Sequence, residues 1–354
     1  MQKIINIILF LLLFTNKMTA VSIDTVYYES PNKLSYDTIP YMIKDPAFLQ
    51  GFNELQMMFN GVKPYSLKRA EFIVEWAYSG GRMDYSKFCH DIDSVANILK
   101  RFIVKKNIQK YKTAPNYALF EYFTKPSTLN GNKAFVYDFE DFTGKKDFRK
   151  QFVTKVLKNH TGQCTSLPLY YKILCDELGG QSSLAFAPRH MYIKHIGEDG
   201  KWVNIELTNG HFVRDEWIIQ TMNISTEAIR NGVFLAALSE KENIAFMITL
   251  LGKAYQQKYS SWDYFPLRCA EEVLKILPNF CDALVLKFCV HQQLGYAYLN
   301  KYGQVRTSYA DNQYSQFRRI LNILDSLGYS QQTDEEYGQS VKKALKDIEN
   351  KTKL

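Results

Sequence analysis

Residues 162–169 constrain the fold most, because they place one cysteine, Cys164, directly before an apolar run with helical spacing. A cysteine in that position is expected at the N-terminus of a helix. The unpaired backbone N–H groups there, together with the positive end of the helix dipole, favour a thiolate over a thiol. The sequence therefore predicts a nucleophilic thiol that needs no metal.

Two residues that suit the same chemistry follow Cys164. His190 lies on a predicted short strand, and Glu206 lies near the end of another. A histidine can take a proton from a thiol, and a carboxylate can orient the histidine ring. Asn204 and Asp215 are alternatives for the orienting role. His195 competes with His190, but its odd number places it on the opposite face of the strand.

This order of residues resembles the core of the transglutaminase-like superfamily, which shares the papain-like cysteine-protease fold. Gly-x-Cys opens a helix, a histidine follows on a strand, and an acid comes sixteen residues after the histidine and four after a tryptophan. Cys164, His190 and Glu206 fall on the Cys, His and Asp positions of that family. This chain has Glu where Asp is more common, and either acid can hold an imidazole by its second nitrogen.

Residues 166–174 and 187–190 also resemble a bacterial branch in which a tetratricopeptide-like tail follows this core. The resemblance implies an α+β fold: a papain-like transglutaminase core, with the cysteine-bearing helix packed on an antiparallel sheet, followed by an all-α tail. Some members of the branch lack the cysteine, whereas this chain keeps it. The expected divisions are a signal peptide over 1–20, a helix-rich part packing on the core over 21–134, the core over 135–224 and the tail over 225–354.

Alternating patterns after the cysteine helix predict strands over 182–187, 191–196, 202–207 and 212–213, the last three joined as an antiparallel meander. Side chains alternate between the two faces of a strand. His190 and Glu206 can meet only if even-numbered residues of both strands point to the same face. The residue numbers of each directly opposed pair must then add up to an even number, so the connecting loop must hold an odd number of residues. Residues 198–200 fit as a three-residue loop with Gly200 in the left-handed conformation.

Helical patterns are predicted elsewhere. They run from about residue 66 to 106 with a break at 79–81, and over 147–157 after a strand at 134–137. After Thr226 the pattern resembles degenerate tetratricopeptide helices. Such helical pairs bury their faces by stacking and often present a groove to a peptide. The alternative is a helical cap that buries one side of the core.

Residues 1–20 read as a secretory signal peptide. Lys3 precedes an apolar run over 4–14, and the small residue Ala20 offers a cleavage point. The run is too short for an ordinary membrane span, so no integral membrane segment is expected after cleavage. The mature protein is expected to be secreted or periplasmic. The alternative is an uncleaved anchor helix.

The net charge of +8 does not by itself indicate a nucleic-acid partner, because the basic residues are dispersed and no nucleic-acid motif accompanies them. Their densest groups lie at 105–106, at 145–146 and near the C-terminus.

The six cysteines suggest a test for disulfides. On one helix, Cys164 and Cys175 would lie about 16 Å apart and Cys281 and Cys289 about 12 Å apart, beyond the reach of a bridge. Either Cys269 pairs with one of the last two, or these thiols are free. No spacing matches a zinc site, and no cofactor is expected.

The resemblance implies a cysteine enzyme with a Cys164–His190–Glu206 triad. It would hydrolyse a peptide or amide bond through a thioester acyl-enzyme, or transfer the acyl group to an amine. Gln163 is a candidate for helping to bind the oxyanion, as is the N–H of Cys164. The alternative function is a catalytically inactive transglutaminase-like and tetratricopeptide-like module that binds a protein partner.

Overall fold

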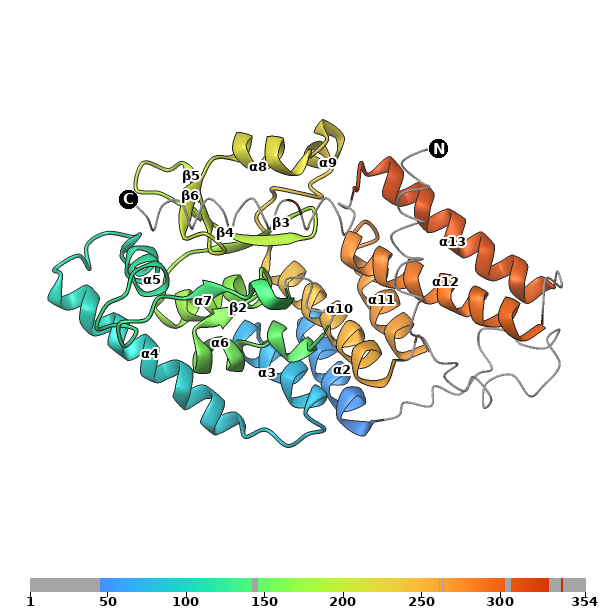
Figure 1. Ribbon diagram of the computed structural model, residues 1–354, viewed down its shortest axis with the longest axis horizontal. Helices are drawn as coiled ribbons and strands as arrows, with labels where there is room; N and C mark the ends of the chain where they lie inside the picture. Colours follow the sequence, from blue (N-terminus) through green and yellow to red (C-terminus); the bar gives the residue numbers. More distant parts are fainter. Residues whose placement is uncertain are drawn as a thin grey trace. The chain divides into compact units, whose positions relative to one another are not determined.

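The computed structural model describes residues 45–141, 146–260, 262, 264–302, 307–330 and 339. The predicted signal peptide over 1–20 lies outside these residues. The fold is α+β, with helices around one four-stranded and one two-stranded sheet (Figure 1). Within the described ranges, no helix combines the length and apolarity needed to cross a membrane.

The described chain forms two compact units. The first is drawn from residues 45–66, 76–82 and 240–329, and the second from residues 67–75 and 83–239. The core-bearing unit therefore extends to Ser239, and the predicted boundary at 224/225 falls inside it. The reason is that the chain returns to the sheet after residue 225: Leu235 and Leu238 donate backbone hydrogen bonds to Phe186 and Leu184 at 3.0 and 2.8 Å.

The first unit consists of helices. They are α2 (Pro46–Phe59), α10 (Glu240–Tyr259), α11 (Tyr264–Ile276), α12 (Cys281–Tyr302) and α13 (Ser308–Ser326). Asp45 caps α2 by accepting a hydrogen bond from the N–H of Ala47 at 2.9 Å. Phe48 packs on Tyr255 and Phe265, with ring centroids 5.2 and 5.8 Å away. The N-terminal helix α2 thus belongs to the same unit as the tail helices.

The helices α10 to α13 pack on one another in chain order. Gly252 of α10 permits a close approach, because a Cβ atom there would lie 2.9 Å from Leu286 of α12 and 3.1 Å from Cys269 of α11. Helices that follow one another in the chain are therefore neighbours in this unit.

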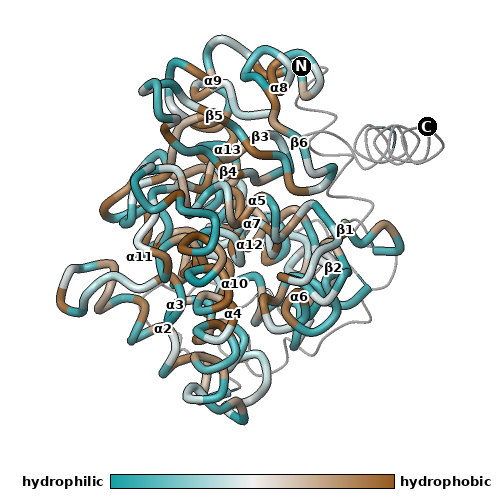
Figure 2. Tube along the Cα trace, turned by 90° about the vertical axis from the view of Figure 1, so that its left-hand side faces the viewer, coloured by the Kyte–Doolittle hydropathy of each residue, from teal (hydrophilic) through white to brown (hydrophobic). Residues whose placement is uncertain are grey.

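The helices of the second unit that precede the four-stranded sheet in the chain contribute to its core. They are α3 (Leu67–Tyr78), whose last residues belong to the first unit, α4 (Tyr85–Lys105), α5 (Ala114–Thr124), α6 (Val153–Asn159) and α7 (Ser166–Glu177). Residues 166–175 of α7 are all buried, and Phe123 of α5 packs 5.5 Å from the rings of both Tyr170 and Tyr171. Along α4 the tube in Figure 2 changes repeatedly between hydrophobic brown and hydrophilic teal, as expected of a helix with one buried face.

The helix predicted over 147–157 is divided in two. A 3-10 helix, η2 (Phe148–Gln151), comes before α6, and Phe152 between them is extended, with φ −89° and ψ 139°. A second short 3-10 helix, η1 (Phe139–Asp141), follows β1 (Val136–Tyr137), which pairs in parallel with β2 (Thr161–Gly162).

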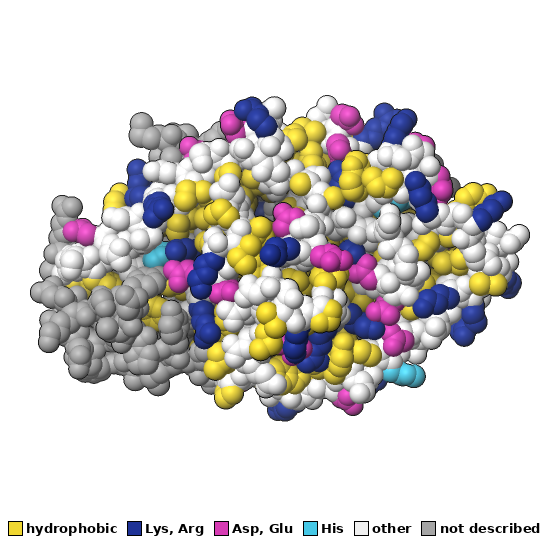
Figure 3. Space-filling model, turned by 180° about the vertical axis from the view of Figure 1, so that it is seen from behind, with side chains coloured by type: hydrophobic (Ala, Val, Ile, Leu, Met, Phe, Trp, Pro, Cys, Tyr) yellow, Lys and Arg dark blue, Asp and Glu magenta, His cyan; other side chains and the backbone are white. Residues whose placement is uncertain are grey.

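The four-stranded sheet is an antiparallel meander in chain order: β3 (Ser183–Ala187), β4 (His190–Ile196), β5 (Trp202–Glu206) and β6 (His211–Val213). Figure 1 shows α8 (Asp215–Met222) and α9 (Thr226–Arg230) on one side of the sheet and α7 on the other. On the face of the molecule in Figure 3, basic side chains are spread among acidic ones over much of the surface.

The predicted register of β4 and β5 is confirmed. Ile193 lies opposite Ile205, an even sum, and Gly197 donates to the carbonyl of Lys201 at 2.8 Å, which extends the ladder. The loop is therefore residues 198–200. Gly200 has φ +80°, the left-handed conformation that this loop requires.

Candidate active site

Cys164 lies in the turn that leads from β2 into α7. The helix begins at Ser166 with Thr165 as its N-cap, and the carbonyl of Gln163 accepts a hydrogen bond from Leu167 at 3.1 Å. The cysteine is half-buried. It therefore sits just before the first turn of the helix, close to the position that the sequence predicts.

Gly162 explains how the chain reaches this position. A Cβ atom there would lie 2.8 Å from Val156 of α6 and 2.9 Å from both Leu167 and Ser166 of α7. Those separations are shorter than ordinary carbon contacts, so β2 can pass between the two helices only without a side chain. The glycine thus sets the backbone path two residues before Cys164.

His190 is brought to the cysteine by a tight turn. Ala187 and His190 are directly opposed across β3 and β4, so Pro188 and Arg189 form a two-residue connection. Arg189 has φ +57°, in the left-handed region, and its carbonyl oxygen lies 3.8 Å from the sulfur of Cys164. The turn therefore fixes the first residue of β4 beside the thiol.

Glu206 contacts His190 diagonally across the strands. Continuing the observed register places Glu206 opposite Tyr192, the next residue after His190 on the same face. The Nε2 atom of His190 lies 2.5 Å from Oε2 of Glu206. The other oxygen, Oε1, accepts hydrogen bonds from the N–H and the hydroxyl of Thr208 at 2.9 and 2.7 Å. One carboxylate oxygen is thus anchored while the other holds the ring.

The environment favours a charged pair. Burial lowers the pKa of His190, but the charge of Glu206 and hydrogen bonds with Cys164 and Glu206 raise it more, to about 10. Burial raises the pKa of Glu206, but the charge of His190 and the hydrogen bonds from His190 and Thr208 bring it below its ordinary value. At neutral pH the ring is therefore an imidazolium. Because Nε2 of His190 contacts Glu206, we infer that the other ring nitrogen, Nδ1, makes the hydrogen bond with Cys164.

Gln163 does not take the role predicted for its side chain. Its amide nitrogen donates to the carbonyl of Asp141 at 2.7 Å and to that of Asp138 at 3.4 Å, and the residue is only 1% exposed. Both amide protons point to the chain after β1, so this side chain is not available to bind an oxyanion. The amide instead anchors the turn that carries Cys164.

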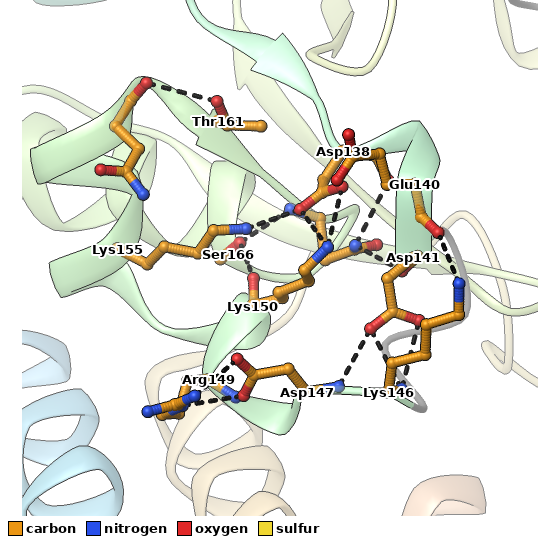
Figure 4. A network of polar contacts seen from close by, with 12 residues as sticks. Asp138, Glu140, Asp141, Lys146, Asp147, Arg149, Lys150, Lys155, Thr161 and Ser166 are labelled. Atoms are coloured by element: carbon orange, nitrogen blue, oxygen red, sulfur yellow. Dashed lines mark hydrogen bonds and ion pairs between the residues drawn. The ribbon is translucent and has the colours of Figure 1, made fainter.

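An ion-pair network continues from this anchor (Figure 4). Asp138 is buried and lies 3.0 Å from the Nζ atom of Lys150 and 2.6 Å from that of Lys155. Burial raises the pKa of Asp138, but the two lysines lower it below its ordinary value. Ser166 donates to the carbonyl of Lys150 at 3.3 Å and accepts from the N–H of Gln163 at 2.9 Å. The network ties β1, η2 and α6 to the start of α7.

The rival residues from the sequence lie elsewhere. His195 faces the opposite side of β4, where its Nδ1 is 3.3 Å from the carbonyl of Ile196 and burial lowers its pKa. Asn204 donates to Asp215 at 2.7 Å, and Lys194 donates to the same carboxylate at 3.2 Å. Asn204 and Asp215 therefore bind each other and a lysine, and Glu206 is the acid that contacts His190.

None of the six cysteines, all of which the structure describes, takes part in a disulfide. Burial raises the pKa of Cys175 to about 11 and that of both Cys281 and Cys289 to about 12. Among the residues that the structure describes, no three His, Cys, Asp or Glu side chains are grouped as metal ligands would be. Cys164 differs from these three in that its thiol forms a hydrogen bond with a histidine, His190.

Two features of the site were not predicted. Thr208 anchors Glu206, and its place two residues after the acid is a usable signal, because threonine N–H and hydroxyl groups often bind nearby side-chain oxygens. The left-handed backbone at Arg189 had no such signal, since arginine rarely adopts that conformation.

Comparison with protein-family models, with curated proteins and with solved structures finds no match to this chain.

Proposed function

We propose that the protein is a transglutaminase-like cysteine enzyme with Cys164 as nucleophile, His190 as general acid and base, and Glu206 as the carboxylate that orients the ring. The observation that carries this proposal is the continuous contact from Cys164 to His190 and from His190 to Glu206 at 2.5 Å. An imidazolium beside a thiol and a helix start behind it both favour the thiolate.

The surrounding fold supports a papain-like transglutaminase core. The cysteine precedes α7, and the histidine and the acid lie on neighbouring antiparallel strands, β4 and β5, of the same unit. This arrangement supports the proposal. A longer acid, Glu206, reaches the ring because Thr208 holds its far oxygen.

The reaction follows from these roles. The thiolate of Cys164 attacks an amide carbonyl, and a carbon–sulfur bond forms. His190 then gives its Nδ1 proton to the leaving amine as the carbon–nitrogen bond breaks, which leaves a thioester. The neutral ring next takes a proton from water as that water attacks the thioester, and the thiolate departs with a carboxylic acid as product. An amine in place of water gives acyl transfer.

We favour hydrolysis of a peptide or amide bond, in a secreted or periplasmic protein whose residues 1–20 are removed. Hydrolysis needs only solvent water, to which the half-buried Cys164 is partly exposed, whereas acyl transfer needs a site for an amine. A second candidate is a binding module, which is supported by the stacked helices α10 to α13 and their likeness to tetratricopeptide pairs.

Labelling with iodoacetamide at pH 7, followed by mass-spectrometric mapping, separates the two. We expect Cys164 to react at least tenfold faster than free cysteine, and His190→Ala to remove that excess. Cys175, Cys281 and Cys289 serve as internal controls because their raised pKa values keep them as thiols. A rate at Cys164 no greater than that of free cysteine would favour the binding module.

Hydrolysis is then distinguished from acyl transfer by incubating the protein with a peptide library, with and without a primary amine. New carboxyl termini in both samples would support hydrolysis. Amine-modified peptides in the sample with the amine, without new carboxyl termini in either sample, would show that acyl transfer is the main reaction.

A further inference from the structure

The carboxyl end of α4 and the loop after it carry a strongly basic surface. Residues 94–120 contain no aspartate or glutamate. The basic side chains in this stretch are all exposed, and we call them the basic surface: Lys100, Arg101, Lys105, Lys106, Lys110 and Lys112. In the sequence, residues 105–106 already stand out as one of the densest groups of basic residues.

Helix geometry gathers the basic residues of α4 on one side. Positions 100, 101, 104 and 105 share a face, because a helix turns by about 100° per residue. Leu99 and Ile103 lie on the opposite face and are buried in the core. Val104 sits among the cations with 60% of its surface exposed. The face therefore combines positive charge with an exposed aliphatic side chain.

Exposed aromatic rings extend the same surface. Tyr111 in the loop and Tyr117 on α5 are 46% and 45% exposed. The Nζ atom of Lys110 lies 5.1 Å from the ring of Tyr111, and Tyr117 stacks on Phe102 of α4 with centroids 6.2 Å apart. Toward the right-hand edge of Figure 3, where the view from behind brings the carboxyl end of α4, dark-blue side chains lie beside yellow hydrophobic ones.

The loop is held in place, so this surface exists before any partner arrives. Asn107, with φ +54°, donates to Val104 at 2.9 Å, and Ile108 donates to Ile103 at 3.3 Å, which is a Schellman ending of α4. At the other end of the loop, Glu198 accepts two hydrogen bonds from Thr113, at 2.7 and 2.6 Å. Glu198 is the acidic group beside Lys112, and it is occupied by this contact.

We propose that this basic surface binds the surface of a bilayer that contains anionic lipids. Lysine outnumbers arginine five to one, and lysine suits a diffuse layer of headgroup charge, whereas arginine suits the bidentate contacts of nucleic-acid recognition. Val104 has no planar group to stack on a base, but it can enter the boundary between headgroups and acyl chains, as can Tyr111 and Tyr117. Nucleic acid is therefore the less suitable partner.

The expected affinity change follows from charge. Each lysine close to an anionic bilayer contributes about fivefold in affinity at moderate ionic strength. Replacing Lys105 and Lys106 by glutamine should therefore weaken binding by about thirtyfold. The contribution is electrostatic, so it should decline further as salt rises above 0.15 M, where the screening length is about 8 Å.

Vesicle co-sedimentation tests this directly, with vesicles of phosphatidylcholine alone and of phosphatidylcholine with 30% phosphatidylglycerol. We expect the full chain to bind the mixed vesicles more tightly, and K105Q/K106Q to lose most of that difference. The control K87Q/K158Q removes the same charge from two other exposed lysines and should bind as the wild type does. The apolar run over 4–14 is common to all variants, so it cancels in the comparison.

Three results would overturn the proposal: equal binding to the two vesicle types, equal loss in the two double variants, or tighter binding to a single-stranded oligonucleotide than to mixed vesicles at the same phosphate concentration. The outcome is independent of the proposed triad. A Cys164→Ala variant should bind vesicles as the wild type does, even if the enzyme proposal fails.

Discussion

Replacing Glu75 by glutamine should change how the stability of the protein depends on pH. Glu71 and Glu75 lie four residues apart on α3 and are fully buried. Oε1 of Glu71 accepts from the N–H of Val153 at 3.4 Å, and Oε1 of Glu75 accepts from the N–H of Thr154 at 3.1 Å. The pair caps α6, whose own N-cap, Phe152, provides no side-chain hydrogen bond.

Two carboxylates in one buried place cannot both ionise without cost. Burial, and then the charge of Glu75, raise the pKa of Glu71 well above its ordinary value, and burial raises that of Glu75 to about 7. Between the ordinary pKa of 4.5 and about 7, the unfolded chain loses a proton that the folded chain keeps. Stability is therefore fully present below pH 4.5 and is lost as the pH rises through 7, by about 3 kcal/mol.

Glutamine at position 75 mimics the protonated acid and cannot ionise. We expect Glu75→Gln to leave the free energy of unfolding nearly unchanged at pH 4.5 and to raise it by up to about 3 kcal/mol at pH 8. Urea unfolding followed by circular dichroism at both pH values measures the difference. Glu121→Gln, which removes an acid paired with Lys125 at the surface, is the matched control and should show no such pH dependence.

The opposite result is informative. If Glu75→Gln lowered stability equally at both pH values, Glu75 would be an ionised cap of α6, and its burial would not raise its pKa. A change in how α6 is capped would also affect the candidate site, because α6 leads directly through β2 to Cys164.

Three other predictions concern the site. Thr208→Val removes one hydrogen bond to the orienting carboxylate and should slow iodoacetamide labelling of Cys164 about tenfold, while Thr208→Ser restores the rate; no change would mean that Glu206 needs no anchor. Gly162→Ala should lower the free energy of unfolding by about 1 to 3 kcal/mol in urea because its Cβ meets atoms at 2.8–2.9 Å; unchanged stability would contradict that contact. In NMR spectra of labelled histidine, the His190 ring should titrate near pH 10, so its stabilising charge is present below pH 6.5 and lost through pH 10; titration near pH 6.5 would argue against the pair.

The sheet could be predicted from the sequence because its signals are local. Alternation of apolar and polar residues marks β4 and β5, and Gly200 marks a loop of odd length. The shared face of His190 and Glu206 then follows from parity alone. His190 and Glu206 do contact each other, and Cys164 does precede a helix, so these two features follow from the sequence.

The parts that could not be predicted depend on distant contacts. The helix expected over 147–157 breaks at Phe152 because its second half is capped by Glu71 and Glu75, about eighty residues earlier. The amide of Gln163 is taken by carbonyls of residues 138 and 141, whose approach no local pattern encodes. The unit that contains the sheet ends later in the chain than the predicted core, because residues 235–238 return to the edge of β3.

The left-handed backbone at Arg189 lowers the stability of the fold, but it holds in place the turn that positions the proposed catalytic residues. A non-glycine residue in that conformation costs about 1 kcal/mol, so Arg189→Gly should raise the free energy of unfolding in urea by up to that amount. Glycine would also let the turn move, and the carbonyl and ring that flank Cys164 would move with it. Labelling of Cys164 should therefore slow in the more stable variant, and equally fast labelling would show that the turn does not position the ring. A protein engineer who ranks substitutions by stability alone would therefore select a more stable protein in which the proposed catalytic residues are less well positioned.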